Sequence, residues 1–414
     1  MTNSTSNSKP SRAADVLVIG AGAFGGWTAW HLARRGARVA LVDAWGAGNP
    51  RGTSSGEARI LRFSYGEKSL YSEWTHRARD IWRACEAEWG LERTPLFTAC
   101  GMLWIWREEN DHYRASVATL DRLREPWERL DASAVARRFP QVRMDPDEFA
   151  VFEPGSGFVR AQRATVAVAE QVARLGGDVR TGFVQPMEGA HAGAPLQTGR
   201  RLTAVRVADD SGAAHERKAG AFIFCCGPWL PQIFPNLLGR RIAVTRQDVF
   251  YFGAPAGDAR FDAPQLPSWV DYETEFYGTP GCDVCGFKLA SNEGVAGFDP
   301  TNGERVTSPD TLAAARAYLA RRFPAMAAAP LVRTRVCQYE RTPDSHIVLD
   351  RHPEWENVWI AGGGSGHGFK FGPALGEILA GLVLDGGQEK IPATLRLGAS
   401  AHPETGELRA KGAY

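Results

Sequence analysis

The stretch DVLVIGAGAFGGWTAWHLARRGARVALVD, residues 15–43, decides the fold. Its pattern predicts an apolar strand, a glycine-rich turn, a helix that ends at a glycine, and a second apolar strand. Gly20, Gly22 and Gly25 fit G-x-G-x-x-G, whose glycines allow a tight turn, a close approach to a pyrophosphate and helix–strand packing. Asp43 ends the second strand, where a carboxylate can accept ribose hydroxyls. The βαβ unit predicts dinucleotide binding, without separating FAD from NAD.

The remaining chain alternates helical and strand patterns around a strand-rich middle. Helices are predicted at 71–90, 110–139, 163–177, 309–322 and 373–387. Strands are predicted at 101–106, 178–184, 221–227 and 358–363, with further strand-like pieces between 242 and 290. This order predicts an α/β protein with a Rossmann-like nucleotide-binding domain, assembled from separated segments, and a substrate domain with a mixed β-sheet.

The expected domain boundaries follow the changes in pattern. The nucleotide-binding domain covers residues 14–98, 151–241 and 335–396. The substrate domain covers residues 99–150 and 242–334. Polar tails are expected at 1–13 and 397–414.

Composition limits the partners and the compartment. The 414 residues are 44% hydrophobic, and the 23% that are charged nearly cancel to a net charge of +1, so we expect neither nucleic acid nor an anionic membrane as a partner. A small molecule is expected instead, with a monomer or a weak homo-oligomer as the assembly. Residues 1–13 have no apolar signal segment and no stretch reaches the length of a membrane span, which favours the cytoplasm.

The cysteines and histidines predict no metal site. Seven cysteines at irregular spacings do not form a disulfide framework and fit a reducing compartment. Cys282 and Cys285 form a CxxC without a second ligand pair, which we interpret as a turn between strands, with metal or redox use as the lesser alternative. The nine histidines contain no HExxH pattern.

A second glycine cluster, GGGSGHGFKFGP at residues 362–373, favours a flavin. It follows a predicted strand and leads into a helix, so backbone amides and the positive end of the helix dipole can face an anionic group. A reduced flavin carries negative charge on its pyrimidine edge, whereas NAD needs no such loop. The alternative is a packing turn, which four glycines around His367 and Lys370 make less favourable.

Five ordered motifs resemble the monomeric sarcosine oxidase family, which includes N-methyltryptophan oxidase and pipecolate oxidase. They are ARILRFSYGE (58–67), FEPGSG (152–157), GFKL (286–289), CQYERTPD with IVLD (337–350) and SGHGFKFGP (365–373). The resemblance covers about 15–387. It implies an FAD enzyme that oxidises the C–N bond of a secondary amino acid to an imine by hydride transfer to flavin N5. It also implies that O2 is reduced to hydrogen peroxide.

The resemblance also implies the roles of five catalytic residues. Arg62 and Lys370 would hold the substrate carboxylate, Arg59 would lie near the opposite flavin face, and Tyr277 would lie over the substrate pocket. Lys288 would stabilise the superoxide formed during oxygen activation, a role that suits a buried ammonium group. If residues 59–62 are extended, their odd spacing sends Arg59 and Arg62 to opposite faces. Solvated surface charge is the alternative for each cation.

The expected cofactor contacts run through the whole nucleotide-binding domain. They comprise Gly20, Gly22, Gly25, Asp43, Ser54, Val184, Gly227, Gly366, His367, Gly368, Lys370 and Cys337. His367 would act through its backbone and packing. In the family, the cysteine at the position of Cys337 is joined through sulfur to the flavin 8α carbon, and nearby Arg335 or Arg341 could favour the thiolate that this requires. Cys85, Cys100, Cys225 and Cys226 are interpreted as buried and inert.

Several positions depart from the family. Ser55 and Asn292 stand where sarcosine oxidases carry histidines, and Glu340 and Arg341 replace small polar residues. We therefore expect an N-alkyl or cyclic α-amino acid other than sarcosine as the substrate. Three alternatives remain open: a dehydrogenase of the same fold with another electron acceptor, a non-catalytic flavin-bound subunit, and an NAD-dependent Rossmann enzyme.

Overall fold

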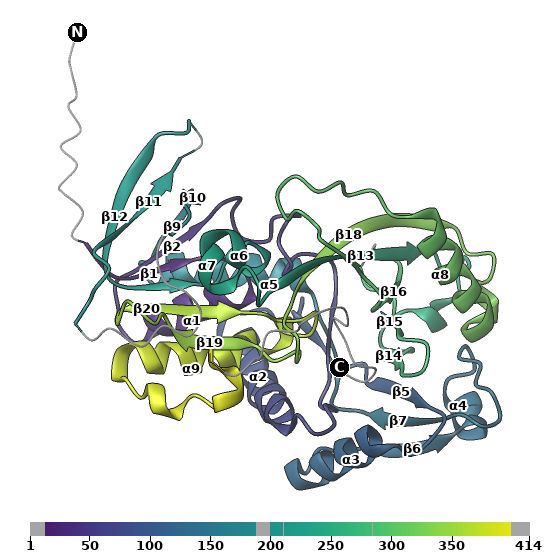
Figure 1. Ribbon diagram of the computed structural model, residues 1–414. Coiled ribbons are helices and arrows are strands. Elements are labelled where there is room, and N and C mark those ends of the chain that lie inside the picture. The colour runs from purple at the N-terminus through teal and green to yellow at the C-terminus, as the bar shows by residue number, and fades with distance from the viewer. Residues whose placement is uncertain (1–12, 188–198, 210, 284, 399–414) are drawn as a thin grey trace.

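The computed structural model describes residues 13–187, 199–209, 211–283 and 285–398 (Figure 1). The expected tails at 1–13 and 397–414 therefore lie outside these residues, apart from Ala13, Leu397 and Gly398. In Figure 1 the described chain forms two lobes, one with helices α1 and α9 beside a sheet and one with a second large sheet. No described helix is long and apolar enough to cross a membrane.

The first lobe is built on an eight-stranded sheet with a parallel centre. Its order along the sheet is β10 (Phe183–Val184), β11 (Ala204–Ala208), β12 (Ala214–Phe224), β1 (Ala14–Ile19), β2 (Val39–Asp43) and β9 (Asp178–Thr181). Strand β20 (Val358–Gly362) adds in parallel to β12, and β19 (Val348–Arg351) pairs antiparallel with β20. Chain segments from both ends of the sequence thus share one sheet, as expected for a split nucleotide-binding domain.

Helices cover this sheet. They are α1 (Ala23–Arg34), α2 (Ser69–Glu88), α5 (Ala161–Arg174) and α9 (Gly372–Asp385), with the short helices α6 (Leu230–Ile233) and α7 (Pro235–Leu238) after β12. Helix α1 begins at Ala23, inside the glycine-rich turn, and packs against α5 and α9. Strand β1 and helix α1 are almost fully buried, so the βαβ unit of the sequence lies in the core.

The second lobe contains a nine-stranded mixed sheet. Its order is β17 (Val295–Ala296), β13 (Ala243–Phe252), β16 (Phe287–Ser291), β15 (Phe276–Thr279), β14 (Ser268–Asp271), β5 (Met102–Trp106), β7 (Phe149–Glu153) and β6 (Glu128–Asp131). Strand β18 (Leu331–Arg341) pairs with β13. Helices α3 (Asp111–Leu123), α4 (Ala132–Arg138) and α8 (Pro309–Arg322) complete the lobe. Strands β14 and β5 are parallel and their neighbours antiparallel, so the predicted mixed sheet is confirmed.

A small antiparallel sheet lies within the segment 59–159. Its order is β3 (Arg59–Leu61), β8 (Gly157–Val159) and β4 (Phe97–Thr98). The domain division stays a prediction, and two of its expected boundaries, 151 and 335, fall inside β7 and β18 of the nine-stranded sheet.

Two predicted elements differ from the structure. The predicted helix at 110–139 is wrong, because Arg124 has a φ of 55° and ends α3, after which β6 pairs with β7 and Asp131 caps α4 through its side chain. The predicted strand at 178–184 is two strands, since β9 pairs with β2 and, after Gly182, β10 pairs with β11. In both places tertiary pairing divides a segment that has a continuous local pattern.

Candidate active site

A cavity of about 300 Å³ lies at the carboxyl ends of the parallel strands. Ligands of open α/β sheets bind at this edge. The segments after β1, β2, β12 and β20 all contribute to its wall. Eight of the expected cofactor contacts line it: Gly20, Gly22, Asp43, Ser54, Val184, Gly227, Gly366 and Gly368. Gly25, Cys337, His367 and Lys370 lie outside its wall.

The first glycine turn has no room for side chains. Gly20 has a φ of 101°, and a Cβ there would lie 2.3 Å from the carbonyl oxygen of Cys225. A Cβ on Gly25 would lie 1.9 Å from the carbonyl oxygen of Gly20, so Gly25 acts by allowing helix α1 to approach the turn. These two glycines fit the roles that the sequence pattern predicts for them.

Two side chains fix the start of helix α1 at the cavity. The backbone N–H of Ala23 donates to Ser54 Oγ at 2.9 Å. The backbone N–H of Ala21 donates to Asp43 Oδ2 at 2.8 Å. Burial raises the pKa of Asp43, and the amide donors at Trp45 and Ala21 oppose that shift. The carboxylate at the end of β2 therefore holds the glycine turn while it faces the cavity.

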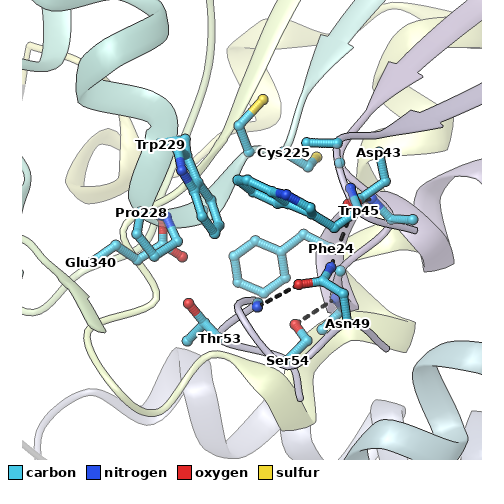
Figure 2. A pocket seen from close by; sticks show the side chains of 18 of the residues that line it. Phe24, Asp43, Trp45, Asn49, Thr53, Ser54, Cys225, Pro228, Trp229 and Glu340 are labelled. Atoms are coloured by element: carbon cyan, nitrogen blue, oxygen red, sulfur yellow. Dashed lines mark hydrogen bonds between the residues drawn. The ribbon is translucent and has the colours of Figure 1, made fainter. Parts of the chain in front are cut away.

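Aromatic side chains cover part of this cavity. Figure 2 shows the indole rings of Trp45 and Trp229 close together, with Phe24 beside them; the ring centroids are 4.9 Å apart and the ring planes are tilted by 46°. Trp229 Nε1 donates to Thr301 Oγ1 at 2.8 Å. Thr301 belongs to the second lobe and also lines the cavity, so both lobes close over it.

A second cavity of about 70 Å³ adjoins the first one. All five expected catalytic residues line it: Arg59, Arg62, Tyr277, Lys288 and Lys370. His367, which was expected at the cofactor, lines this cavity as well. The two cavities share the wall residues Arg59, Tyr339, Gly366 and Phe369. Residues from four distant parts of the sequence thus meet around one small space.

Arg62 and Lys370 are buried basic side chains in this wall. Arg62 is 4% exposed, and its guanidinium lies 4.0 Å from the Tyr65 ring and 4.8 Å from the Trp104 ring. Lys370 Nζ donates to the Tyr65 hydroxyl at 2.7 Å and to the His367 carbonyl at 2.8 Å. Neither cation forms an ion pair with a carboxylate in the described part of the chain. Burial, and then the charges of Arg62 and Arg59, hold the pKa of Lys370 well below its usual range.

Lys288 approaches the same cavity from strand β16. It is 2% exposed, and its Nζ donates to the carbonyl oxygen of Ala58 at 2.9 Å. Burial, followed by the charge of Arg59, lowers the pKa of Lys288 to about 7. This ammonium group therefore changes its charge near neutral pH.

The guanidinium group at the sulfur of Cys337 belongs to Arg59. Arg59 Nη2 donates to Cys337 Sγ at 3.4 Å. Of the two arginines expected there, Arg335 donates to Ser55 Oγ and Arg341 donates to the carbonyl oxygen of Asn292. Cys337 is 6% exposed, and its neighbour Tyr339 lines both cavities. The contact was not predicted, because it joins strands β3 and β18 across the two lobes.

Three further residues line the cavities. Tyr339 lies two positions after Cys337 on β18, so both side chains point to one face, and its hydroxyl is 2.6 Å from the Tyr277 hydroxyl. The period of two around Cys337 could have identified it. Asn292 lines the small cavity, with its Nδ2 donating to Glu275 Oε2 at 3.3 Å. Glu340 lines the large one.

His367 is held in a fixed orientation. Its Nε2 lies 2.9 Å from the carbonyl oxygen of Ser345, and its ring packs against Tyr65 and Tyr71. Burial, and then the charge of Lys370, hold its pKa well below its usual range. A neutral ring with Nε2 protonated fits these surroundings, because only a protonated nitrogen can donate to the carbonyl.

Cys282 and Cys285 belong to the turn between β15 and β16. The backbone N–H of Cys285 donates to the carbonyl oxygen of Cys282, and burial raises the pKa of Cys282 to about 12. In the described ranges, no group of three or more histidine, cysteine, aspartate or glutamate side chains is placed to hold a metal ion.

The chain belongs to the FAD dependent oxidoreductase family, whose sequence profile matches residues 15–382. It is 32% identical to the monomeric sarcosine oxidase of Streptomyces avermitilis, over 90% of this chain and 94% of that protein. It is 28% identical to human peroxisomal sarcosine oxidase (89% and 92%) and 26% identical to N-methyl-L-tryptophan oxidase of Salmonella typhi (89% and 94%). These similarities confirm the predicted family and an oxidoreductase of CH–NH donors that depends on FAD.

Solved structures agree on the fold. NikD, an amino acid oxidase of nikkomycin biosynthesis, superimposes with a TM-score of 0.74 at 21% identity, covering 93% of this chain and 97% of NikD. The L-proline dehydrogenase of P. horikoshii superimposes with a TM-score of 0.76 at 19% identity, covering 94% of this chain and 97% of the dehydrogenase. The family and the sarcosine oxidase relatives favour FAD over NAD, and an oxidoreductase over a non-catalytic subunit.

Proposed function

We propose that the protein is an FAD-dependent oxidase of a secondary α-amino acid, N-alkyl or cyclic and other than sarcosine. Its products would be an imine and hydrogen peroxide. The observation that carries this proposal is the pair Arg62 and Lys370, two buried basic side chains without a carboxylate partner among the described residues, on the wall of a small cavity beside the cofactor cavity. Buried charges are normally paired, so a site of this kind favours an anionic ligand group.

The larger cavity fits FAD. Its glycine turn has no space for a Cβ at Gly20, helix α1 starts at its wall, and the second glycine cluster contributes Gly364, Gly366 and Gly368. Helix amino termini and glycine turns are suited to bind a pyrophosphate. When bound, FAD would supply the hydride acceptor and return the electrons to O2.

Arg62 and Lys370 would position the substrate by its carboxylate. A guanidinium group can bind a carboxylate through two parallel hydrogen bonds, and the packing of Arg62 between Tyr65 and Trp104 fixes the plane of that group. The substrate nitrogen would then lie among positive side chains, which lower the pKa of an amine. The amine would therefore bind in its neutral form, and no separate base is required.

Lys288 would act in the oxygen half of the reaction. A buried ammonium group beside the cofactor stabilises a developing superoxide anion, and its hydrogen bond to Ala58 keeps it in place. An electron acceptor other than O2 would not need this charge. Lys288 therefore supports an oxidase rather than a dehydrogenase.

Cys337 would hold the cofactor covalently through Sγ, and Arg59 would orient the sulfur through its hydrogen bond. Bond formation would remove the thiol hydrogen and one hydrogen of the 8α methyl group, and O2 would take up the two electrons. The geometry that supports this proposal is the 3.4 Å contact between Arg59 and the sulfur.

The test of the proposed function is an anaerobic titration of the purified protein with sarcosine, pipecolate, proline and N-methyl aromatic amino acids. We expect at least one compound other than sarcosine to bleach the flavin absorbance, and air to restore it with one peroxide per turnover. A flavin that no secondary amino acid reduces would exclude the proposed substrate class. Reduction without peroxide formation in air would indicate a dehydrogenase.

A further inference from the structure

Glu340 occupies a place in the cofactor cavity that the expected site residues do not explain. It lies on β18, lines the large cavity and is 6% exposed. Its Oε2 atom has no hydrogen-bond partner in the described part of the chain. A buried carboxyl oxygen without a partner costs free energy, so a ligand that donates to this oxygen would remove that cost.

Backbone amides hold one side of the Glu340 carboxyl group. The backbone N–H groups of Gly363 and Gly364 donate to the carboxyl group. A Cβ on Gly362 would lie 3.2 Å from Oε2, so glycine leaves room for this side chain. No ion pair of Glu340 occurs among the described residues. Burial raises its pKa to about 7, with the two amides opposing the shift.

The position of Glu340 in the cavity indicates which part of FAD it would contact. Figure 2 shows Glu340 across the cavity from Asp43, which lies at the end of β2. Tyr339 and Gly366 mark the part of the cavity that adjoins the small one. Glu340 is also next to Gly227, where a Cβ would lie 3.9 Å from its Oε2. It therefore faces the middle of the cavity, between the region of the dinucleotide turn and the region of the proposed substrate site.

We propose that Glu340 binds the ribityl chain of FAD, with Oε2 accepting a hydrogen bond from one ribityl hydroxyl. The hydroxyls of this chain are the donors that connect the two ends of FAD. A pyrophosphate offers only acceptors and negative charge, which the ionised carboxylate of Glu340 would repel. The proposal rests on FAD binding and not on the amino acid substrate, so the two proposals can fail separately.

The test measures FAD binding without turnover. Full-length apoprotein carrying Cys337→Ser, in which no thioether can form, is titrated with FAD while flavin fluorescence is followed. Glu340→Leu is expected to weaken FAD binding roughly ten- to hundredfold, because a hydrogen bond to a charged group is lost. Glu86→Gln is the matched control, because Glu86 is a buried glutamate that lines neither cavity. It should keep the wild-type affinity.

FAD analogues that lack the 2′, 3′ or 4′ ribityl hydroxyl identify the contact. One of the three analogues should bind to the parent protein and to Glu340→Leu with equal affinity, because that analogue already lacks the hydroxyl that donates to Glu340. If the circular dichroism spectrum of Glu340→Leu differs from that of the parent protein, Glu340→Gln is used instead. In Glu340→Gln the loss of FAD affinity caused by the missing hydroxyl should be smaller, because the acceptor is neutral. Unchanged FAD affinity in Glu340→Leu, or an equal penalty for all three analogues in every variant, overturns the proposal.

Discussion

Arg59 donates a hydrogen bond to the sulfur of Cys337, with 3.4 Å between Nη2 and Sγ, although the two residues are 278 positions apart in the sequence. This contact orients the sulfur and brings a positive charge to it. It is the geometric basis for the proposed attachment of the flavin, and its effect can be measured directly.

Arg59→Gln should slow covalent attachment about tenfold or more, because the hydrogen bond from a charged group to the Cys337 sulfur is lost. Apoprotein is mixed with FAD, samples are precipitated with acid, and the flavin in the pellet is followed over time. Arg335→Gln is the control, since Arg335 donates to Ser55 and Pro50 instead. Equal rates for both variants, or a colourless pellet in the wild type, would contradict the assigned role.

Lys288→Met should slow reoxidation of the reduced flavin by O2 about 10²- to 10³-fold, the usual effect of removing an electrostatic group from an active site. The anaerobic reductive half-reaction should change much less. In the wild type the oxygen rate should fall as pH rises through about 7, because Lys288 loses its proton there. Stopped-flow absorbance at several pH values checks both statements, with the exposed Lys218→Met as control. A flat pH profile in the wild type would refute the role of Lys288.

The lowered pKa of Lys288 also predicts that the free energy of unfolding depends on pH. Its pKa is about 7 in the folded protein against 10.5 for an ordinary lysine, so between these values the unfolded chain binds more protons. The contribution of Lys288 to the free energy of unfolding therefore increases with pH from 7 to 10.5. We expect the stability advantage of Lys288→Met apoprotein to be largest below pH 7 and to narrow above it, as measured by urea unfolding. A constant difference would show that Lys288 titrates normally.

Arg62→Gln and Lys370→Gln should each lower kcat/KM for the amino acid substrate about ten- to hundredfold, because a hydrogen bond between charged groups is lost. For the corresponding amine without a carboxylate, wild type and variants should be similarly slow. The exposed Arg206→Gln serves as the control. A loss of equal size for the acid and the amine would mean that these cations do not bind the carboxylate.

The small cavity should favour compact substrates. Its volume of about 70 Å³ is less than a quarter of the roughly 300 Å³ of the cofactor cavity. Amino acids with a short N-alkyl group or a five- or six-membered ring are therefore expected to react with at least tenfold higher kcat/KM than N-methyltryptophan. Steady-state peroxide assays over the substrate panel check this order. A preference for the large aromatic substrate would require the cavity to open.

Local sequence patterns predicted the parts of the fold that depend on neighbouring residues. The βαβ unit at 15–43 was predictable because the strand, the turn and the helix lie next to each other, and the glycines fit the turn for steric reasons. The helix predicted at 110–139 failed, because the left-handed backbone of Arg124 and the pairing of β6 with β7 depend on the tertiary fold.

The residues that line the small cavity could be singled out from the sequence, but the contacts between them could not. The expected catalytic residues Arg59, Arg62, Tyr277, Lys288 and Lys370 all line the small cavity. The contact of Arg59 with Cys337 could not be predicted, since the arginines closer in sequence to Cys337 bond elsewhere. Glu340 could be singled out as a departure, but its position in the cavity depends on which face of β18 it occupies.

Strand β18 carries three proposed site residues within four positions, and its pairing with β13 fixes the face that each side chain occupies. Gln247 stands opposite Cys337, and Thr245 stands opposite Tyr339. A strand shifted by one position turns every side chain to the other face. A single residue deleted between 331 and 336 would thus put Gln338 in the place of Cys337 and Arg341 in the place of Glu340. The register of β18 against β13 in the second lobe therefore determines which side chains of β18 face the cofactor cavity of the first lobe.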